Sequence, residues 1–466
     1  MKKPQKLLAR FAGAAAVLGS LVGPGFGQTK DSAAQCGPPV YCAPSDRVVR
    51  KESPLSIGDA GSVFDDPDFG SRIVRVTDGN TGTQLGGGFP GVSFATDSSS
   101  EQNTWNKSAT RFYAVTEGGR AVLFGFDPES KNSWPVRISG GGWLPLRPGA
   151  SFSFVDPDVI YGSPASGDSA VARYRLSTRK TSTVFDARRC VPHSGRVTTL
   201  GDISVSSNDQ QFATYAGGPI QDEHMLVMVF DSTQGCRWYN TQTGQMGGDW
   251  GPAGAATTPQ KYLIHNARLS KRGDFVRITG PGGGVEAYWQ VATLNVTACS
   301  SRAAPYCGGH QVLGYAHLVN QPGTLDDMNI VIRPLTSIKA GFQLINPLLT
   351  PTQWTLDSHW SWNNDDANDS FPVCGSTYRE VPPFTRIERA WDREVICIRT
   401  DGTQSQVWRF AHHRSTAANG FWSTPRGNVS QDGKFYVFTS DWENTLGFLN
   451  GSRTQHRTDV FVVELK

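Results

Sequence analysis

The feature that most constrains this chain is a short pattern that recurs along most of its length. In Ser430–Asp441 (SQDGKFYVFTSD), a polar turn at Asp432-Gly433 precedes an alternating strand from Phe435 to Phe438. Turn residues followed by β-branched and aromatic residues are typical of a β-hairpin unit. The pattern recurs, in places degenerately, in six upstream segments: Ser270–Gly280, Ser207–Gly217, Lys107–Gly118, Asp156–Pro164, Thr324–Pro334 and Asn363–Ser376.

The spacing of these units predicts the fold. The strands are expected to start at Phe112, Val159, Phe212, Phe275, Ile330, Phe371 and Phe435. Subtraction of these residue numbers gives spacings of 41 to 64 residues, which suit four short strands per unit. One four-stranded unit cannot bury both of its faces, whereas a closed ring lets neighbours cover each other. The chain is therefore expected to be all-β and to fold as a seven-bladed β-propeller.

The two ends of the repeat region predict how the ring closes. The chain ends with DVFVVEL (Asp459–Leu465), which we interpret as the third strand of the last blade. Its missing fourth strand is predicted at Ser71–Gly79, which resembles the fourth-strand segment Trp134–Gly141. The propeller is thus expected over residues 71–466, closed by an N-terminal strand and preceded by an extension at 28–70.

The first residues predict export. Lys2, Lys3, Lys6 and Arg10 precede an apolar run from Phe11 to Val22 and the small residues Gly25 and Gly27. This is the plan of a secretory signal peptide over residues 1–27, and the protein is expected to be secreted or periplasmic. Its removal takes four basic residues from a formal net charge of +3 and leaves −1. With no long Lys/Arg run and no further apolar segment, neither nucleic acid nor a membrane span is expected; the oligomeric state stays open.

The chain contains eight cysteines, an even number that suits disulfides in an exported protein. Pairing of sequence neighbours predicts four bonds: Cys36–Cys42, Cys190–Cys236, Cys299–Cys307 and Cys374–Cys397. Zinc binding is less favoured because no Cys-x-x-Cys motif occurs.

The last unit also resembles a known repeat. VSQDGKFYVFTSDW followed by DVFVVEL is similar to the WD40-like repeat of TolB-type propellers, which also occurs in oligogalacturonate lyases. In the lyases, the resemblance implies metal ligands in a Gln-x-x-His-x-His motif just before the final polar turn. The matching stretch here, FWSTPRGN (Phe421–Asn428), has neither histidine nor glutamine, and Arg426 stands near the last histidine position. This departure argues against the lyase metal site.

Residues just before the innermost strands of a propeller gather at one mouth of its channel. Counting back from the predicted strand starts selects Asp202, His265, His317, His359 and Arg426. Imidazoles and a carboxylate could bind a divalent metal such as Mn, Zn or Ca, with His265, His359 and His412 as hypothetical ligands. Alternatively, these histidines are structural hydrogen-bonding groups, and Arg426 either binds an anionic group or pairs with an aspartate between blades.

Four tryptophans are predicted near the same mouth. Exposed there, they would stack on sugar rings or anchor a protein partner; the alternative is packing between blades. They are Trp105, Trp360, Trp362 and Trp422.

The adjacent histidines His412 and His413 raise a separate question. If Val407–His412 is a strand, successive side chains point to opposite sides, so the two imidazoles cannot face one site. The alternative to a site is an exit from blade 6 with polar ends in water.

Two functions are compatible with these patterns. One is an exported propeller that binds a polysaccharide or protein partner at the channel mouth without chemistry. The other is a lyase acting on uronate-containing glycans, in which a metal or Arg426 neutralises the carboxylate and His265 removes a proton.

Overall fold

The structure is a computed structural model that describes residues 36–466, except 87–89, 139–141, 168, 192–199, 218–223, 259–262, 281–284, 300–306, 322–329, 344–355, 365–366, 380–381 and 402–405. Cys36–Lys466 form one compact unit. The predicted signal peptide, residues 1–27, and the start of the predicted extension lie outside the described residues. No helix in the described part of the chain is long and apolar enough to cross a membrane.

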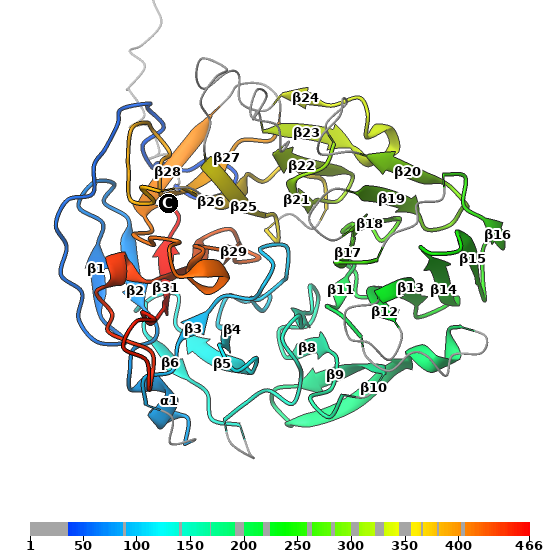
Figure 1. Ribbon diagram of the computed structural model, residues 1–466, viewed down its shortest axis with the longest axis horizontal. Helices are drawn as coiled ribbons and strands as arrows, with labels where there is room; N and C mark the ends of the chain where they lie inside the picture. The colour runs from blue at the N-terminus through cyan, green and yellow to red at the C-terminus, as the bar shows by residue number, and fades with distance from the viewer. Residues whose placement is uncertain are drawn as a thin grey trace, which may run out of the picture. The chain divides into compact units, whose positions relative to one another are not determined.

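Seven antiparallel sheets surround a central channel as the blades of a propeller (Figure 1). From the centre outward, blade 1 is β3 (Phe94–Ala95), β4 (Arg111–Thr116), β5 (Ala121–Phe126) and β6 (Ser133–Pro135); blade 2 is β7 (Ser151–Phe152), β8 (Val159–Gly162), β9 (Ala170–Arg175) and β10 (Lys180–Asp186). Blade 3 is β11 (Ser204–Val205), β12 (Gln211–Gly217), β13 (His224–Asp231), β14 (Gly235–Asn240), β15 (Gln245–Gly248) and β16 (Gly254–Ala255); blade 4 is β17 (Asn266–Leu269), β18 (Phe275–Thr279), β19 (Glu286–Gln290) and β20 (Val296–Cys299).

The remaining blades follow the same order. Blade 5 is β21 (His310–Leu313), β22 (His317–Gln321), β23 (Val331–Pro334) and β24 (Phe342–Gln343), and blade 6 is β25 (Leu356–Ser361), β26 (Val373–Arg379), β27 (Glu394–Ile398) and β28 (Val407–His412). Blade 7 is β29 (Gly427–Val429), β30 (Phe435–Ser440) and β31 (Asp459–Glu464), completed by β2 (Arg72–Arg75) and β1 (Val63–Asp65). The predicted seven-bladed fold is therefore confirmed.

The predicted closure by an N-terminal strand is also confirmed. Strand β2 pairs antiparallel with β31, with Ile73 opposite Val463 and Val74 opposite Val462. Because β2 comes from the beginning of the described chain and β31 from its end, their ladder joins the two ends of the ring. Strand β1 adds a fifth strand that the sequence pattern did not indicate.

Blade 5 departs from the predicted register. The repeat strand is the second strand of each blade, but the predicted start at Ile330 immediately precedes β23, the third strand. Polar turns also connect other pairs of strands in a blade, so a degenerate turn signal can mark the wrong hairpin. The second strand of this blade is β22, which starts at His317.

The blades bury both of their faces. All six residues of β30 are buried, although its sequence pattern predicts an alternating strand. One apolar cluster joins Phe124 of blade 1 with Phe435 and Val462 of blade 7, and similar clusters join other neighbouring blades. A strand packed between two blades therefore needs no solvent-facing side.

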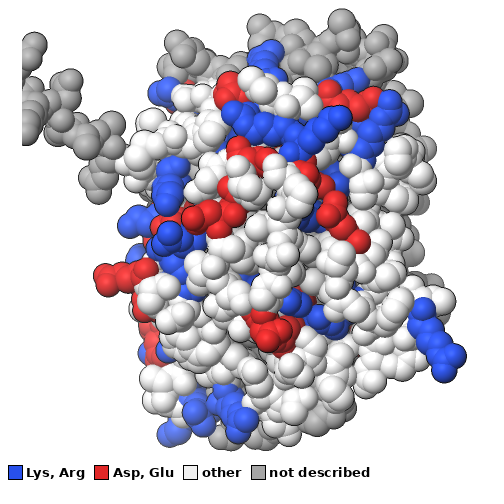
Figure 2. All heavy atoms as spheres, turned by 90° about the vertical axis from the view of Figure 1, so that its left-hand side faces the viewer, with Lys and Arg blue, Asp and Glu red and all other residues white. Residues whose placement is uncertain are grey.

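The N-terminal extension, described from Cys36, lies along the outer edge of blade 6. Arg409 in β28 makes two hydrogen bonds to the extension. Its main-chain N–H donates to Pro44 O at 2.9 Å, and its side-chain Nη1 donates to Val48 O at 2.7 Å. Nη1 of Arg393 binds Glu52 Oε2 at 2.8 Å. Figure 2 shows acidic and basic side chains interspersed on the side of the molecule that lies to the left in Figure 1. The extension covers an edge that would otherwise be open to strand pairing.

All four predicted disulfides are present. Cys374 and Cys397 link directly opposite positions of β26 and β27, and Cys190–Cys236 connects the end of blade 2 to blade 3. The others, Cys36–Cys42 and Cys299–Cys307, close short loops.

Candidate functional site at the channel mouth

A loop of the chain itself fills the channel. The innermost strand of blade 1 ends at Ala95, and its ladder resumes at Trp105, which bridges Phe112. The nine residues between them, Thr96–Thr104, leave the sheet and enter the centre of the ring; we call them the channel loop. The Ser-rich sequence TDSSSEQNT within a repeat unit was the only signal for it.

Gln102 anchors the channel loop to the surrounding blades. Its Nε2 is 2.6 Å from Ala150 O of blade 2 and 2.7 Å from Ile203 O of blade 3. Its main-chain oxygen accepts from Nδ2 of Asn363 at 2.9 Å and of Asn428 at 2.7 Å. A cavity of about 20 Å³ remains beside the loop, which is room for one water molecule. A larger ligand would therefore bind at a mouth of the channel rather than inside it.

The innermost strands all run in the same direction, so their first residues lie at one end of the channel. Asp202 lies two residues before β11 and His265 directly precedes β17. His359 lies within β25, and Arg426 directly precedes β29. In blade 5 this place is taken by His310, the first residue of β21, rather than by His317. His317 instead lies in the second strand, with Nδ1 2.9 Å from Asp369 Oδ2.

The acidic side of this mouth is internally paired. Arg268 Nη2 lies 2.6 Å from Asp202 Oδ2. Oδ2 of Asp97, in the channel loop, accepts from Tyr113 Oη and from the N–H of Gly149, both at 2.8 Å. Burial raises the pKa of Asp97, and the charge of Asp202 raises it further. Neither carboxylate is left to bind a ligand cation on its own.

Arg426 is the exception among the buried charges here. It is 0% exposed, and no carboxylate in the described part of the chain lies within ion-pair distance of it, so the alternative of a direct pair with an inter-blade aspartate is not seen among these residues. Its Nη1 reaches Ser98 O at 3.4 Å, while Nε and Nη2 have no hydrogen-bond partner among the described residues. Burial lowers the pKa of Arg426 to about 10, against a smaller opposing effect of the charge of Asp97, which leaves the guanidinium charged at neutral pH.

Two aromatic side chains accompany Arg426. Its guanidinium carbon lies 3.5 Å from the ring centre of Phe421 and 5.9 Å from that of Trp422. Phe421 is 53% exposed and Trp422 is partly buried. The mouth next to blade 7 therefore combines a buried cation with an accessible aromatic surface.

The mouth histidines differ in their surroundings. Nε2 of His359 is 3.0 Å from Tyr378 Oη, and the His359 ring centre is 4.5 Å from that of His310. His265 is exposed, and burial of part of its ring lowers its pKa, with a smaller lowering from Arg277.

Three of the four predicted tryptophans are not available to a ligand. Trp105, Trp360 and Trp362 are at most 1% exposed and pack between blades. Trp105 Nε1 donates to Asn428 O at 3.1 Å, and Trp362 Nε1 to Phe371 O at 2.8 Å. The packing alternative thus holds for these three, because the interior needs large fillers. It supplies a partner for the indole N–H of Trp105 and of Trp362, but none among the described residues for that of Trp360.

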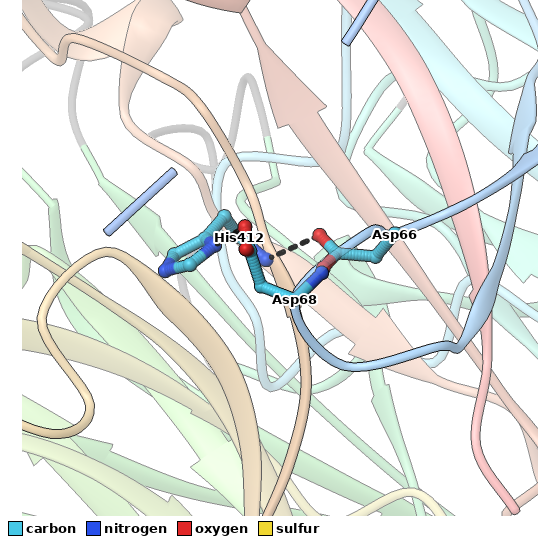
Figure 3. Close-up of side chains that lie close together, drawn as sticks. All are labelled: Asp66, Asp68 and His412. Atoms are coloured by element: carbon cyan, nitrogen blue, oxygen red, sulfur yellow. Dashed lines mark hydrogen bonds and ion pairs between the residues drawn. The ribbon is translucent and has the colours of Figure 1, made fainter. Parts of the chain in front are cut away.

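Strand β28 ends at His412, as predicted. His412 and His413 are both 0% exposed, which excludes the alternative that this end of blade 6 places polar side chains in water. His413 Nε2 donates to Thr377 O at 2.7 Å, and its Nδ1 accepts from Ser415 N at 3.0 Å. His412 turns the other way, towards Asp66 and Asp68 of the extension (Figure 3). Burial lowers the pKa of His412 to about 4 and raises that of Asp66 to about 6.

The hypothetical trio of metal ligands is not brought together. Among the described residues, the group of potential ligands that lies within coordinating reach is Asp66, Asp68 and His412, and it contains neither His265 nor His359. At the mouth itself, the buried Arg426 occupies the place where the lyase resemblance would put a metal ligand. A fixed guanidinium does not fit a cation site.

Seven antiparallel sheets form a ring that an N-terminal strand closes and whose central channel is filled by the channel loop. This architecture defines the chain as a seven-bladed β-propeller. No family model matches the sequence, and no curated protein matches it. One solved structure with a similar fold is an oligogalacturonate lyase from Vibrio parahaemolyticus, with a TM-score of 0.48 over 90% of this chain and 98% of that chain, at 10% sequence identity.

Proposed function

We propose that this protein is exported and binds carboxylate-bearing glycans at the channel mouth, without cleaving them. The observation that carries the proposal is the buried guanidinium of Arg426, whose Nε and Nη2 have no partner among the described residues. The charge of Asp97 acts on this guanidinium only from beyond ion-pair distance. A buried cation with no carboxylate in direct contact is costly, and a ligand carboxylate that reached it past the covering ring of Phe421 would compensate it with charge-assisted hydrogen bonds.

The aromatic neighbours favour a sugar as the carrier of that carboxylate. Phe421 presents an exposed ring next to Arg426, and an aromatic ring can stack on the apolar face of a pyranose. The channel loop restricts such a ligand to the surface of the mouth, which suits a polymer lying across it. The four disulfides are consistent with an oxidising compartment outside the cytoplasm.

The positions of His265 and Arg426 give less support to the alternative of a lyase that uses these two residues. His265 belongs to blade 4 and Arg426 to blade 7, and a separation of three blades is the largest that a ring of seven allows. Acid–base chemistry on one sugar needs its groups within hydrogen-bond reach of that sugar. The channel loop also lies between these two blades.

Calorimetric titration of the purified chain with a polyuronate tests the proposal, with the fully methyl-esterified polymer as the uncharged control. We expect binding of the charged polymer alone, about tenfold or more weaker in Arg426→Gln, because a hydrogen bond to a charged group contributes about 1.5–3 kcal/mol. Phe421→Ala should weaken binding with little risk to folding. Trp134→Ala is the matched control, since Trp134 is 43% exposed on the outermost strand of blade 1.

Equal affinity for the charged and esterified polymers, or no binding to either, would refute the proposal. The same samples should be monitored for unsaturated uronate ends, and none are expected. Their formation would favour the lyase instead, and the first base to test would be His359 with its partner Tyr378, in the blade next to Arg426.

A further inference from the structure

The structure brings one nitrogen and two carboxylates together far from the channel mouth (Figure 3). Asp66 and Asp68 belong to the extension, His412 is the last residue of β28, and their potential ligand atoms all lie within 4.8 Å of one another. Asp66 and His412 are at most 1% exposed, and the Asp68 side chain is 11% exposed. This is a buried cluster rather than a solvated acidic surface.

The hydrogen bonds of the two carboxylates show that both are acceptors. Asp66 Oδ1 accepts from the N–H of Phe69 at 3.0 Å, and Oδ2 accepts from the main-chain N–H of His412 at 3.0 Å. Asp68 Oδ2 accepts from Ser53 N at 3.0 Å, and Oδ1 accepts from Ser53 Oγ at 2.6 Å. All four oxygens therefore take part as the oxygens of ionised carboxylates do.

The imidazole of His412 leaves a lone pair directed at this cluster. Its Nε2 is 3.1 Å from Arg50 O, and a carbonyl can only accept, so Nε2 carries the proton. In the neutral ring Nδ1 is then an acceptor, and it lies 3.2 Å from Asp68 Oδ2, another acceptor. Nδ1 has no hydrogen-bond donor among the described residues. Two buried acceptors at this distance repel each other unless something positive lies between them.

The nearby basic side chains do not supply that charge. Among the described residues, no Lys or Arg nitrogen lies within 4.0 Å of Asp66 or Asp68. Three of the neighbouring arginines have another acid: Arg50 with Asp46 at 2.7 Å, Arg393 with Glu52 at 2.8 Å and Arg409 with Glu394 at 2.7 Å. The fourth, Arg414, acts electrostatically on Asp68 only from beyond 4.0 Å, and its Nη1 lies 3.8 Å from Glu443 Oε2. The two carboxylates thus carry two negative charges, which one divalent cation would balance.

We propose that Asp66, Asp68 and His412 bind a divalent transition-metal cation that fastens the N-terminal extension to blade 6. One imidazole nitrogen and two carboxylates favour Zn²⁺ or Mn²⁺ over the all-oxygen preference of Ca²⁺. His412 follows Asp68 by 344 positions, by subtraction of 68 from 412, so the ion would join the start of the described chain to the outer strand of blade 6.

The test uses the full chain, stripped with a chelator and titrated calorimetrically with ZnCl₂, MnCl₂ and CaCl₂. We expect one Zn²⁺ or Mn²⁺ per chain, bound at least tenfold more weakly by the isosteric variant Asp68→Asn. Asp65→Asn is the matched control, since Asp65 is exposed and directly precedes Asp66. The second control is His265→Ala at the channel mouth, and both controls should bind as the wild type does.

Hydrogen exchange gives a second readout that does not depend on any variant folding. Metal should slow amide exchange in the extension between residues 44 and 54, and this protection should disappear with chelator. The proposal is overturned if neither Zn²⁺ nor Mn²⁺ binds, if Asp68→Asn binds as tightly as the wild type, or if His265→Ala abolishes binding.

Discussion

Asn428 donates a hydrogen bond of 2.7 Å from Nδ2 to the main-chain oxygen of Gln102, although the two residues are 326 positions apart. Asn428 lies in the innermost strand of blade 7, and Gln102 lies in the channel loop that blade 1 sends into the centre of the ring. Through this contact and its equivalents in blades 2, 3 and 6, the propeller is held together at its axis as well as between neighbouring blades.

We expect Gln102→Ala to destabilise the protein by about 2–4 kcal/mol, because the buried main-chain oxygen of Ile203 would lose its donor and Arg268 would lose its acceptor Gln102 Oε1. Chemical denaturation measures the change. The exposed Gln245 provides the control, and Gln245→Ala should change stability by no more than about 0.5 kcal/mol. Similar stability of the two variants would show that the channel loop does not support the ring.

Ring closure by β2 leads to a second prediction. Ile73 is 0% exposed and lies opposite Val463, so Ile73→Ala should cost about 2–5 kcal/mol by leaving a cavity in the closing sheet. Thermal unfolding should show the loss as a lowered Tm. Val63→Ala in β1, where Val63 is 41% exposed, should have little effect. A wild-type Tm for Ile73→Ala would contradict closure at this ladder.

The disulfides can be checked directly. Peptide mapping under non-reducing conditions should recover Cys374 linked to Cys397, two residues that face each other across β26 and β27. Replacing both with alanine should lower the free energy of unfolding by about 2–4 kcal/mol. Linkage of Cys374 to any other cysteine would refute the pairing.

Binding of a polyuronate should depend on pH through His265. Partial burial lowers the pKa of His265 below 6.5, so the ring is neutral at pH 7. It becomes positively charged only as the pH falls through this lowered pKa. Uronate carboxylates stay ionised above about pH 4, so affinity should rise as the pH is lowered from 7 to 5.

Calorimetry at a series of pH values measures this dependence, and His265→Ala should make it shallower. His317→Ala is the control, because His317 lies in the second strand of blade 5, away from the channel mouth, and its imidazole contacts Asp369. Affinity that falls on acidification would exclude a contribution from a mouth histidine.

The repeat pattern was enough to predict seven blades and the closing strand at 71–79, and the pairing of sequence neighbours was enough to predict the four disulfides. These features depend on local turn chemistry, strand periodicity and closeness in sequence, all of which can be read from the chain. The same reasoning assigned the wrong hairpin in blade 5, where several polar turns compete as markers. It also expected tryptophans at the mouth, because a sequence position does not say whether a neighbouring blade covers a side chain.

By itself, then, the sequence determined the architecture and placed Asp202, His265 and Arg426 just before innermost strands. Tertiary structure alone decided that Thr96–Thr104 fills the channel, that Arg426 is buried without a carboxylate among the described residues, and that His412 faces Asp66 and Asp68. Each of these depends on contacts between segments more than 300 positions apart. Such contacts arise only when the ring closes and brings its first and last segments into the same space.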